Sequence, residues 1–213
     1  MRNSAVRRFM LTAGMLCLGL AAEPTRAAIV FSDDFDTESL ALNHGSFTNW
    51  TSVSGTTDTI GNGFHDFLPG NGVYVDLDGT ALDAGFGMST PLTLAPGRYA
   101  LSFDLAGSQR GDTNIVTVSV GTGATPTLFA TTTLTLASEV PFTANTLTFV
   151  VSAATSDVRI MFMNDGGDNV GALLDRVVLE DVVANPEPST LASAGIGGLI
   201  ALGVAWRRRR RVA

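Results

Sequence analysis

Lysine is absent from the chain, cysteine occurs once, and histidine occurs only as His44 and His65. Without lysine there is no Walker A phosphate-binding loop and no Schiff-base chemistry, because both need the lysine amine. A His-Glu-x-x-His zinc motif and the Gly-x-Ser-x-Gly motif of serine hydrolases are missing as well. These absences predict a protein that is not an enzyme. The acidic residues still leave a pair of carboxylates for glycoside cleavage open as an alternative.

Positive charge is scarce in the body of the chain. Between Ile29 and Asn185 four arginines stand against 18 acids, so this part carries a formal charge of −14. A body this acidic does not bind nucleic acid by neutralising phosphates. It also repels acidic polymers unless divalent cations bridge the two.

The first 27 residues have the layout of a secretory signal peptide. Three arginines precede an apolar run of 14 residues at 9–22, and a small residue, Ala27, stands at the expected cleavage point. A membrane span is the alternative, but the run is too short and lacks a stop-transfer flank. Cleavage near Ala27 removes the single cysteine, Cys17, so the mature chain is expected to contain no disulfide.

A second apolar segment lies near the C-terminus, at 191–206, and five arginines follow it at 207–211. As a helix, its 16 residues reach about 24 Å at ~1.5 Å per residue, somewhat less than a bilayer core of about 30 Å. The arginines are expected to stay on the cytoplasmic side while the body is exported. A plain anchor helix and a nucleic-acid-binding patch at 207–211 are the alternatives.

The order of parts at 184–213 resembles the PEP-CTERM sorting signal of Gram-negative bacteria. Pro186, Glu187 and Pro188 supply the Pro-Glu-Pro motif, and the glycine-rich apolar segment and the arginine cluster follow it. The resemblance implies a membrane-held intermediate that an exosortase cleaves near the motif. It also implies export together with extracellular polysaccharide and biofilm machinery. The Leu-Pro-x-Thr-Gly box of a Gram-positive sortase substrate is missing.

Residues 28–183 alternate between apolar and polar side chains, as half-buried antiparallel strands do. The segments RYALSFDLAG, IVTVSVG, TLTFVVSA and DVRIMFMND show this pattern, and glycine-rich and proline-containing joints separate them. About ten short strands at regular spacing predict an all-β fold, an antiparallel β-sandwich or jelly roll.

Several body segments resemble the choice-of-anchor C proteins and their plant relatives of the domain-of-unknown-function 642 group. They are GSFTNWTSVSGTTDTIG, GNGVYVDLDGT, LAPGRYALSFDLAGSQRG and DNVGALLDRVVL. The resemblance implies a jelly roll of the galactose-binding type, as in several carbohydrate-binding modules. The family's Asn-Gly-Ser-Phe-Glu opening is present here only as DDFDTE.

Related modules often hold a structural Ca²⁺ between an acid after the first strand and an aspartate on the last strand. Asp175 matches the second position and Asp36 the first, with Asp34 and Glu38 as substitutes. Alternation places Asp175 on one strand face with apolar neighbours, where a carboxylate is costly to bury without a partner. The neighbours expected on that face are Leu173, Val177 and Leu179. A surface acid paired with arginine or solvent is the alternative.

Two places are candidates for sugar binding. Trp50 is the only tryptophan of the body and could stack on a sugar ring, although a place in the core is the alternative. The loop NDGGDN offers Asn164, Asp165 and Asp168 to a sugar or a cation, with a solvated turn as the alternative. The segment VDLDG at 75–79 is interpreted as a strand end and turn rather than a metal-binding loop.

The sequence therefore predicts an exported, non-enzymatic surface protein that binds or organises the extracellular polysaccharide of a biofilm matrix. A structural matrix protein without a glycan ligand is the alternative from a different class, and a small polysaccharide hydrolase is a third. Apart from a structural Ca²⁺, no cofactor is expected.

Overall fold

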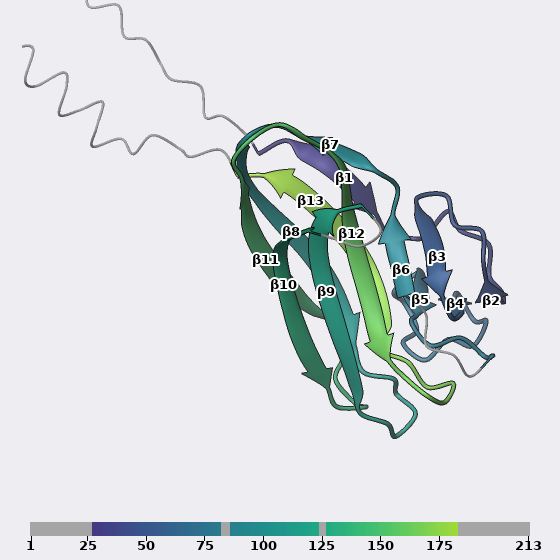
Figure 1. The fold of residues 1–213 in the computed structure, drawn as a ribbon. Coiled ribbons are helices and arrows are strands. Elements are labelled where there is room, and N and C mark those ends of the chain that lie inside the picture. Colours follow the sequence, from purple (N-terminus) through teal and green to yellow (C-terminus); the bar gives the residue numbers. More distant parts are fainter. Residues whose placement is uncertain (1–26, 82–85, 124–126, 183–213) are drawn as a thin grey trace, which may run out of the picture.

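The computed structural model describes residues 27–81, 86–123 and 127–182, and their regular structure consists of β-strands (Figure 1). The predicted sorting motif, apolar segment and arginine cluster lie outside these residues, as does all of the predicted signal peptide except Ala27. Within the described part of the chain, no helix is long and apolar enough to cross a membrane. The strands are β1 (Ile29–Asp33), β2 (Ala41–His44), β3 (Trp50–Ser54), β4 (Thr57–Gly61), β5 (Val73–Asp76), β6 (Phe86–Ser89), β7 (Leu92–Leu94), β8 (Gly97–Ala106), β9 (Asn114–Thr122), β10 (Thr127–Leu136), β11 (Thr143–Val151), β12 (Thr155–Asp165) and β13 (Leu173–Asp181).

Two antiparallel sheets pack face to face. The first sheet has the order β11-β8-β13-β5-β4-β2, with β1 beside β13, and the second has the order β10-β9-β12-β6-β3, with β7 beside β12. Figure 1 shows the long strands β8, β11 and β13 of the first sheet behind β9, β10 and β12 of the second. The predicted all-β, jelly-roll sandwich is confirmed. The strands beyond the expected ten are short, such as the three-residue β7, and a run of that length is too short to be recognised by alternation.

The predicted alternation fills the space between the sheets. In β8 the inward residues Leu101, Phe103 and Leu105 are at most 1% exposed, because each points away from solvent at period two. The corresponding positions of the other long strands are buried in the same core: Val116, Val118, Val120, Phe149, Val151, Val158, Ile160 and Phe162.

β13 departs from the prediction at its centre. Leu174, Val177 and Leu179 belong to the main core, whereas Leu173 belongs to a second cluster. The reason is a β-bulge between Asp175 and Val178, in which Arg176 has a φ of 48°. The extra residue reverses the alternation, so Asp175 shares its face with Leu173 and the expected common face with Val177 and Leu179 is wrong.

The second cluster covers the outer face of the first sheet near β4 and β5. Its buried part consists of Ile60, Tyr74, Ala106 and Leu173. Half-buried aromatic residues of the loop between β4 and β5 pack on it. The Tyr74 hydroxyl fixes that loop, because it donates to Asp66 Oδ1 at 2.9 Å and accepts the Leu68 N–H at 2.9 Å. This packing places residues 62–72 beside two acidic cavities.

Candidate functional site

The predicted calcium ligands Asp36 and Asp175 line one surface cavity of about 300 Å³. Asp34 and Asn71 line the same cavity, so two strand connections and β13 contribute oxygen atoms to it. Asp36 is held in place because its Oδ1 accepts the Val73 N–H at 2.8 Å. Carboxylate and amide oxygens of this kind are the ligands that Ca²⁺ takes.

Close packing around Asp36 requires glycine at position 72. Gly72 has a φ of +77°, and a Cβ atom on it would lie 2.2 Å from Asp36 Oδ1. Both the backbone conformation and the space therefore exclude a side chain there. Gly72 allows the loop to approach the carboxylate closely.

Asp175 is buried at the base of this cavity. Burial is the main reason that its pKa is raised from 3.8 to about 6, and the neighbouring acids Asp104 and Asp36 add to the rise. The Arg176 N–H and guanidinium lower it, but that guanidinium pairs with Asp104 and lies 3.8 Å from Asp175 Oδ2. A buried carboxylate with an incomplete partner is a favourable place for a cation.

Glu38 does not join this cavity. Its Oε1 accepts the Thr48 N–H at 2.7 Å, and its Oε2 lies 3.9 Å from His44 Nε2. In the described residues, no group of three or more His, Cys, Asp or Glu side chains has the spacing of a metal site. A cation at the Asp36–Asp175 cavity would therefore depend on amide and carbonyl oxygens and water for its other ligands.

Trp50 lies in the core, which is the alternative that the sequence left open. It is 8% exposed, its Nε1–H donates to Asp33 Oδ2 at 2.9 Å, and its ring packs against Phe31, Phe35 and Phe162. In this position it offers no face to a sugar ring, so the stacking role predicted for Trp50 is wrong. The alternation of β3 is too short to have placed it from sequence.

The three candidate residues of the NDGGDN loop separate in the structure. Asn164 is buried and donates to Asn114 Oδ1 at 3.2 Å, so it joins β12 to β9. Asp165 and Asp168 are exposed, and Asp168 Oδ1 accepts the Val170 N–H at 2.8 Å. The loop is thus a turn whose acids remain accessible.

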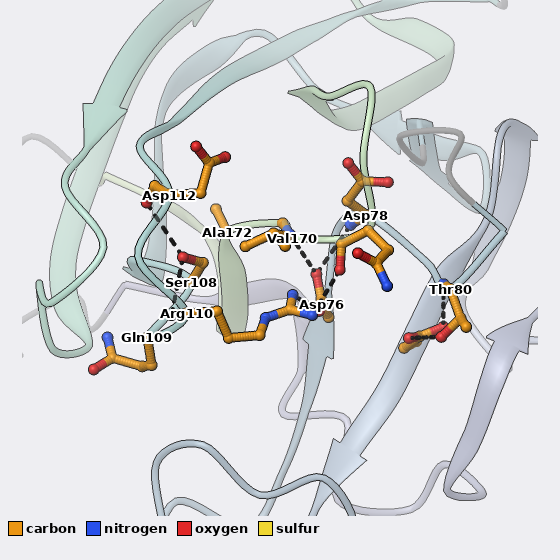
Figure 2. A network of polar contacts seen from close by, with 12 residues as sticks. Asp76, Asp78, Thr80, Ser108, Gln109, Arg110, Asp112, Val170 and Ala172 are labelled. Atoms are coloured by element: carbon orange, nitrogen blue, oxygen red, sulfur yellow. Dashed lines mark hydrogen bonds and ion pairs between the residues drawn. The ribbon is translucent and has the colours of Figure 1, made fainter.

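A further polar site, which the sequence did not indicate, lies at the end of β5. The side chain of Asp76 is 2% exposed and forms an ion pair with Arg110 Nη2. Its Oδ1 accepts the N–H groups of Asp78 and Gly171, each at 3.1 Å. Figure 2 shows Asp76 at the centre of this network, with Arg110 reaching it from the loop after β8. The one signal available in the sequence was that Arg110 is one of only four arginines in the body.

The Arg110 guanidinium forms one wall of a cavity of about 170 Å³. Its carbon Cζ lies 4.8 Å from the centre of the Phe67 ring, and Nη1 donates to the Asn169 carbonyl at 2.6 Å. Asp58, Thr80 and His65 line the same cavity. The arrangement combines an apolar ring, a cation and several hydrogen-bonding groups in one opening.

Burial dominates the electrostatics of Asp76. It raises the pKa of that carboxyl from 3.8 to about 7, although Arg110 and the Asp78 N–H act in the opposite direction. Asp58 stands opposite Asp76 in the β4–β5 pair and adds to the rise. Arg110 therefore offsets part of the cost of burying the Asp76 charge.

Comparison with known proteins gives one family match and several matches of fold. No curated protein matches the chain. Among solved structures, a carbohydrate-binding module of Cellvibrio mixtus lichenase 5A has 13% identity and a TM-score of 0.40, covering 73% of this chain and 99% of the module. The adhesin domain of Lys-gingipain from Porphyromonas gingivalis has 16% identity and a TM-score of 0.46, covering 73% and 99%. A xylan-binding domain from Paenibacillus barcinonensis has 11% identity and a TM-score of 0.45, covering 74% and 97%.

The family match concerns the C-terminal part of the chain. Residues 186–210 match the model of the PEP-CTERM protein-sorting motif, in agreement with the motif recognised at Pro186, Glu187 and Pro188. The chain therefore carries a PEP-CTERM protein-sorting motif, which indicates an exported protein with a C-terminal tail sorted by an exosortase.

Proposed function

We propose that this protein is a non-enzymatic polysaccharide-binding protein of the Gram-negative cell surface or biofilm matrix. The sorting motif supports the location. The observation that carries the binding function is the cavity in which Arg110 lies between Asp76, Phe67 and Asn169. This cavity, rather than Trp50, is the proposed sugar-binding site.

The chemistry of the cavity matches that of a sugar ring. A sugar presents hydroxyl groups that both donate and accept hydrogen bonds, together with apolar C–H faces. Arg110 lines the cavity with its guanidinium, whose Nη1 and Nη2 each carry a second N–H beyond those given to Asn169 and Asp76. The Phe67 ring offers an apolar surface, and His65 and Thr80 add polar groups at the opening. A volume of about 170 Å³ suits a single ring or a chain end.

The charge of the body selects among polysaccharides. Its formal charge of −14 repels uronic-acid and sulfated polymers unless divalent cations intervene. We therefore infer that the preferred ligand is neutral.

Two acids, Asp58 and Asp76, line the cavity, and their hydrogen bonds favour sugar binding over hydrolysis. Asp58 accepts the N–H groups of Asn43 and Thr80 and the Thr80 hydroxyl. Both oxygens of Asp76 are likewise engaged, by two N–H groups and Arg110. A glycosidase needs one carboxylate free to attack or activate water and another free to donate a proton. Neither acid is free in this way.

We expect Arg110→Lys to weaken binding to a neutral polysaccharide by about tenfold or more, because lysine keeps the charge but loses the planar guanidinium fork. A panel of neutral and acidic polysaccharides in affinity electrophoresis, followed by calorimetry, measures the effect. Arg159→Lys is the matched control, because Arg159 pairs with the exposed Asp157 on β12 and is absent from the cavity lining.

If the folded wild-type protein binds none of the polysaccharides in the panel, the result would support the structural matrix role instead. Release of reducing sugar would support the hydrolase.

The proposed processing has its own measurement. We propose that an exosortase cuts the membrane-held intermediate near Pro186–Pro188, so that the mature protein ends near Glu187 or Pro188. The intact mass of the protein released from the cell surface is expected to lack the 207–211 arginines. A mature mass that includes Arg211 would reduce the tail to a permanent anchor.

A further inference from the structure

Asp78, two residues after Asp76, is fixed in the interior by its own backbone. The main chain on either side is held, since Leu77 N–H donates to the Ala172 carbonyl at 2.9 Å and Gly79 N–H donates to the Thr56 carbonyl at 2.8 Å. The residue is 0% exposed. Its carboxylate therefore cannot turn out to solvent without breaking these contacts.

Neither carboxyl oxygen of Asp78 has a hydrogen-bond partner among the described residues. This contrasts with Asp76, whose oxygens are all engaged. A buried carboxylate without partners is unfavourable, because it has lost the solvation of water and gained nothing in exchange. Native proteins resolve such a group by pairing it or by binding a cation.

Asp78 packs against the chain that follows the NDGGDN loop, because a Cβ atom on Gly171 would lie 2.8 Å from the Asp78 Cβ atom. Burial raises the pKa of Asp78 from 3.8 to about 6, and Asp168 of that loop is the charged group that raises it most. The Gly167 N–H of the same loop lies close enough to lower the pKa but does not reach hydrogen-bond geometry. Gly171 closes the other side, where a Cβ atom would lie 2.3 Å from the Asp78 nitrogen.

The nearby positive charge is already committed. Arg110 lowers the pKa of Asp78, but its guanidinium already forms the ion pair with Asp76 and donates to the Asn169 carbonyl. Asp58 adds further negative charge. The loop and the strand end thus bring together carboxylates that lack a counter-charge of their own.

We propose that Asp78 and Asp168 bind a divalent cation of the calcium type, which fastens the NDGGDN loop to the end of β5. Two segments 90 residues apart, VDLDG and NDGGDN, together form this site, and it is separate from the Asp36–Asp175 cavity. Carboxylates, loop carbonyls and water provide the hard oxygen ligands that Ca²⁺ prefers over nitrogen or sulfur. The same loop supplies the Asn169 carbonyl to Arg110, so the cation would also order one wall of the sugar cavity.

The test uses the purified full chain, stripped of metal, with CaCl₂ as the only addition. Hydrogen exchange of residues 164–170 is followed by mass spectrometry, and bound calcium is counted by calorimetry. In the wild type, calcium is expected to slow exchange in this loop at least about tenfold, because the cation joins two carboxylates on different segments. Asp78→Asn and Asp168→Asn are each expected to abolish that protection and to remove one calcium equivalent.

Asp165→Asn is the matched control, because Asp165 is an exposed acid of the same loop and is not among the groups that chiefly shift the pKa of Asp78. It is expected to keep the protection. Asp168→Asn keeps the experiment decisive should Asp78→Asn not fold, since Asp168 is exposed. Absence of calcium-dependent protection in the wild type, or its retention in either folded Asp78 or Asp168 variant, overturns the proposal and leaves Asp78 protonated or bonded to water.

Discussion

Replacement of Arg110 by methionine is expected to lower the free energy of unfolding by about 3–5 kcal/mol at pH 8.5, as when one partner of a buried ion pair is removed. The side chain of Asp76 is 2% exposed, so its carboxylate would remain buried without a counter-charge. The variant also loses the hydrogen bond to the Asn169 carbonyl and the contact with the Phe67 ring. Urea unfolding followed by near-ultraviolet circular dichroism measures the loss.

The loss is expected to grow with pH. The pKa of Asp76 is raised to about 7 in the folded protein, above its ordinary 3.8, so the protonated carboxyl is favoured in the fold and this stabilisation disappears as the pH rises through about 7. Arg110 lowers that pKa, and its removal raises it further. Near pH 5 both proteins hold a neutral Asp76, and Arg110→Met costs only hydrogen bonds and packing, about 1–2 kcal/mol. Above pH 7 only the wild type retains a partner for the ionised carboxylate.

Two further variants separate the ion pair from general damage. Arg110→Met combined with Asp76→Asn is expected to recover part of the stability at pH 8.5, because the asparagine oxygen still accepts two N–H groups and carries no charge. Arg159→Met removes an ion pair whose Asp157 side chain is 51% exposed, and is expected to cost less than about 1 kcal/mol. An Arg110→Met loss of equal size at pH 5 and pH 8.5 would contradict the role of the Asp76 charge.

The fold was accessible to sequence reasoning where strands are long. In β8 and β9 every inward position follows from period two, because one face of each strand meets the opposing sheet. Period two does not hold across the β13 bulge, and no residue type in Leu173–Asp181 indicates that Arg176 adopts a positive φ. Glycine or asparagine would have been the usual signal, and neither is present there.

The candidate sites likewise divide into those that the sequence indicated and those that depend on contacts between distant segments. The family resemblance paired Asp36 with Asp175, and the structure brings both to one cavity. The alternation of β13 did not predict this, because the bulge at Arg176 changes the face on which Asp175 lies. The pairing of Asp76 with Arg110 and the approach of Asp78 to Asp168 depend on contacts between segments 34 and 90 residues apart. Local pattern contains no information about such contacts. What the sequence did contain was the excess of acids over arginines, which leaves several carboxylates without a partner of their own.

Removal of calcium is expected to lower the melting temperature by about 5–10 °C through the Asp36–Asp175 cavity. A ligand present at 100 times its Kd stabilises the folded state by about 2.7 kcal/mol. For a domain of this size 1 kcal/mol corresponds to about 2–4 °C. The cation would neutralise the buried Asp175, whose pKa is raised to about 6, and would join the β1–β2 connection to β13. Thermal unfolding at pH 7.5 is measured after exhaustive EDTA treatment and again after calcium is restored.

Asp175→Asn distinguishes this cavity from the site proposed at Asp78. Without calcium, the variant is expected to melt at or above the temperature of the stripped wild type, because it replaces a poorly partnered buried carboxylate by a neutral amide. On addition of calcium it is expected to gain little from this cavity while retaining the slowed exchange of residues 164–170. Glu38→Gln is the matched control, since Glu38 contacts Thr48 and His44 and is absent from the cavity lining. A wild-type melt that EDTA leaves unchanged would remove the calcium site from the Asp36–Asp175 cavity, because the strand junction would then be stable on its own hydrogen bonds.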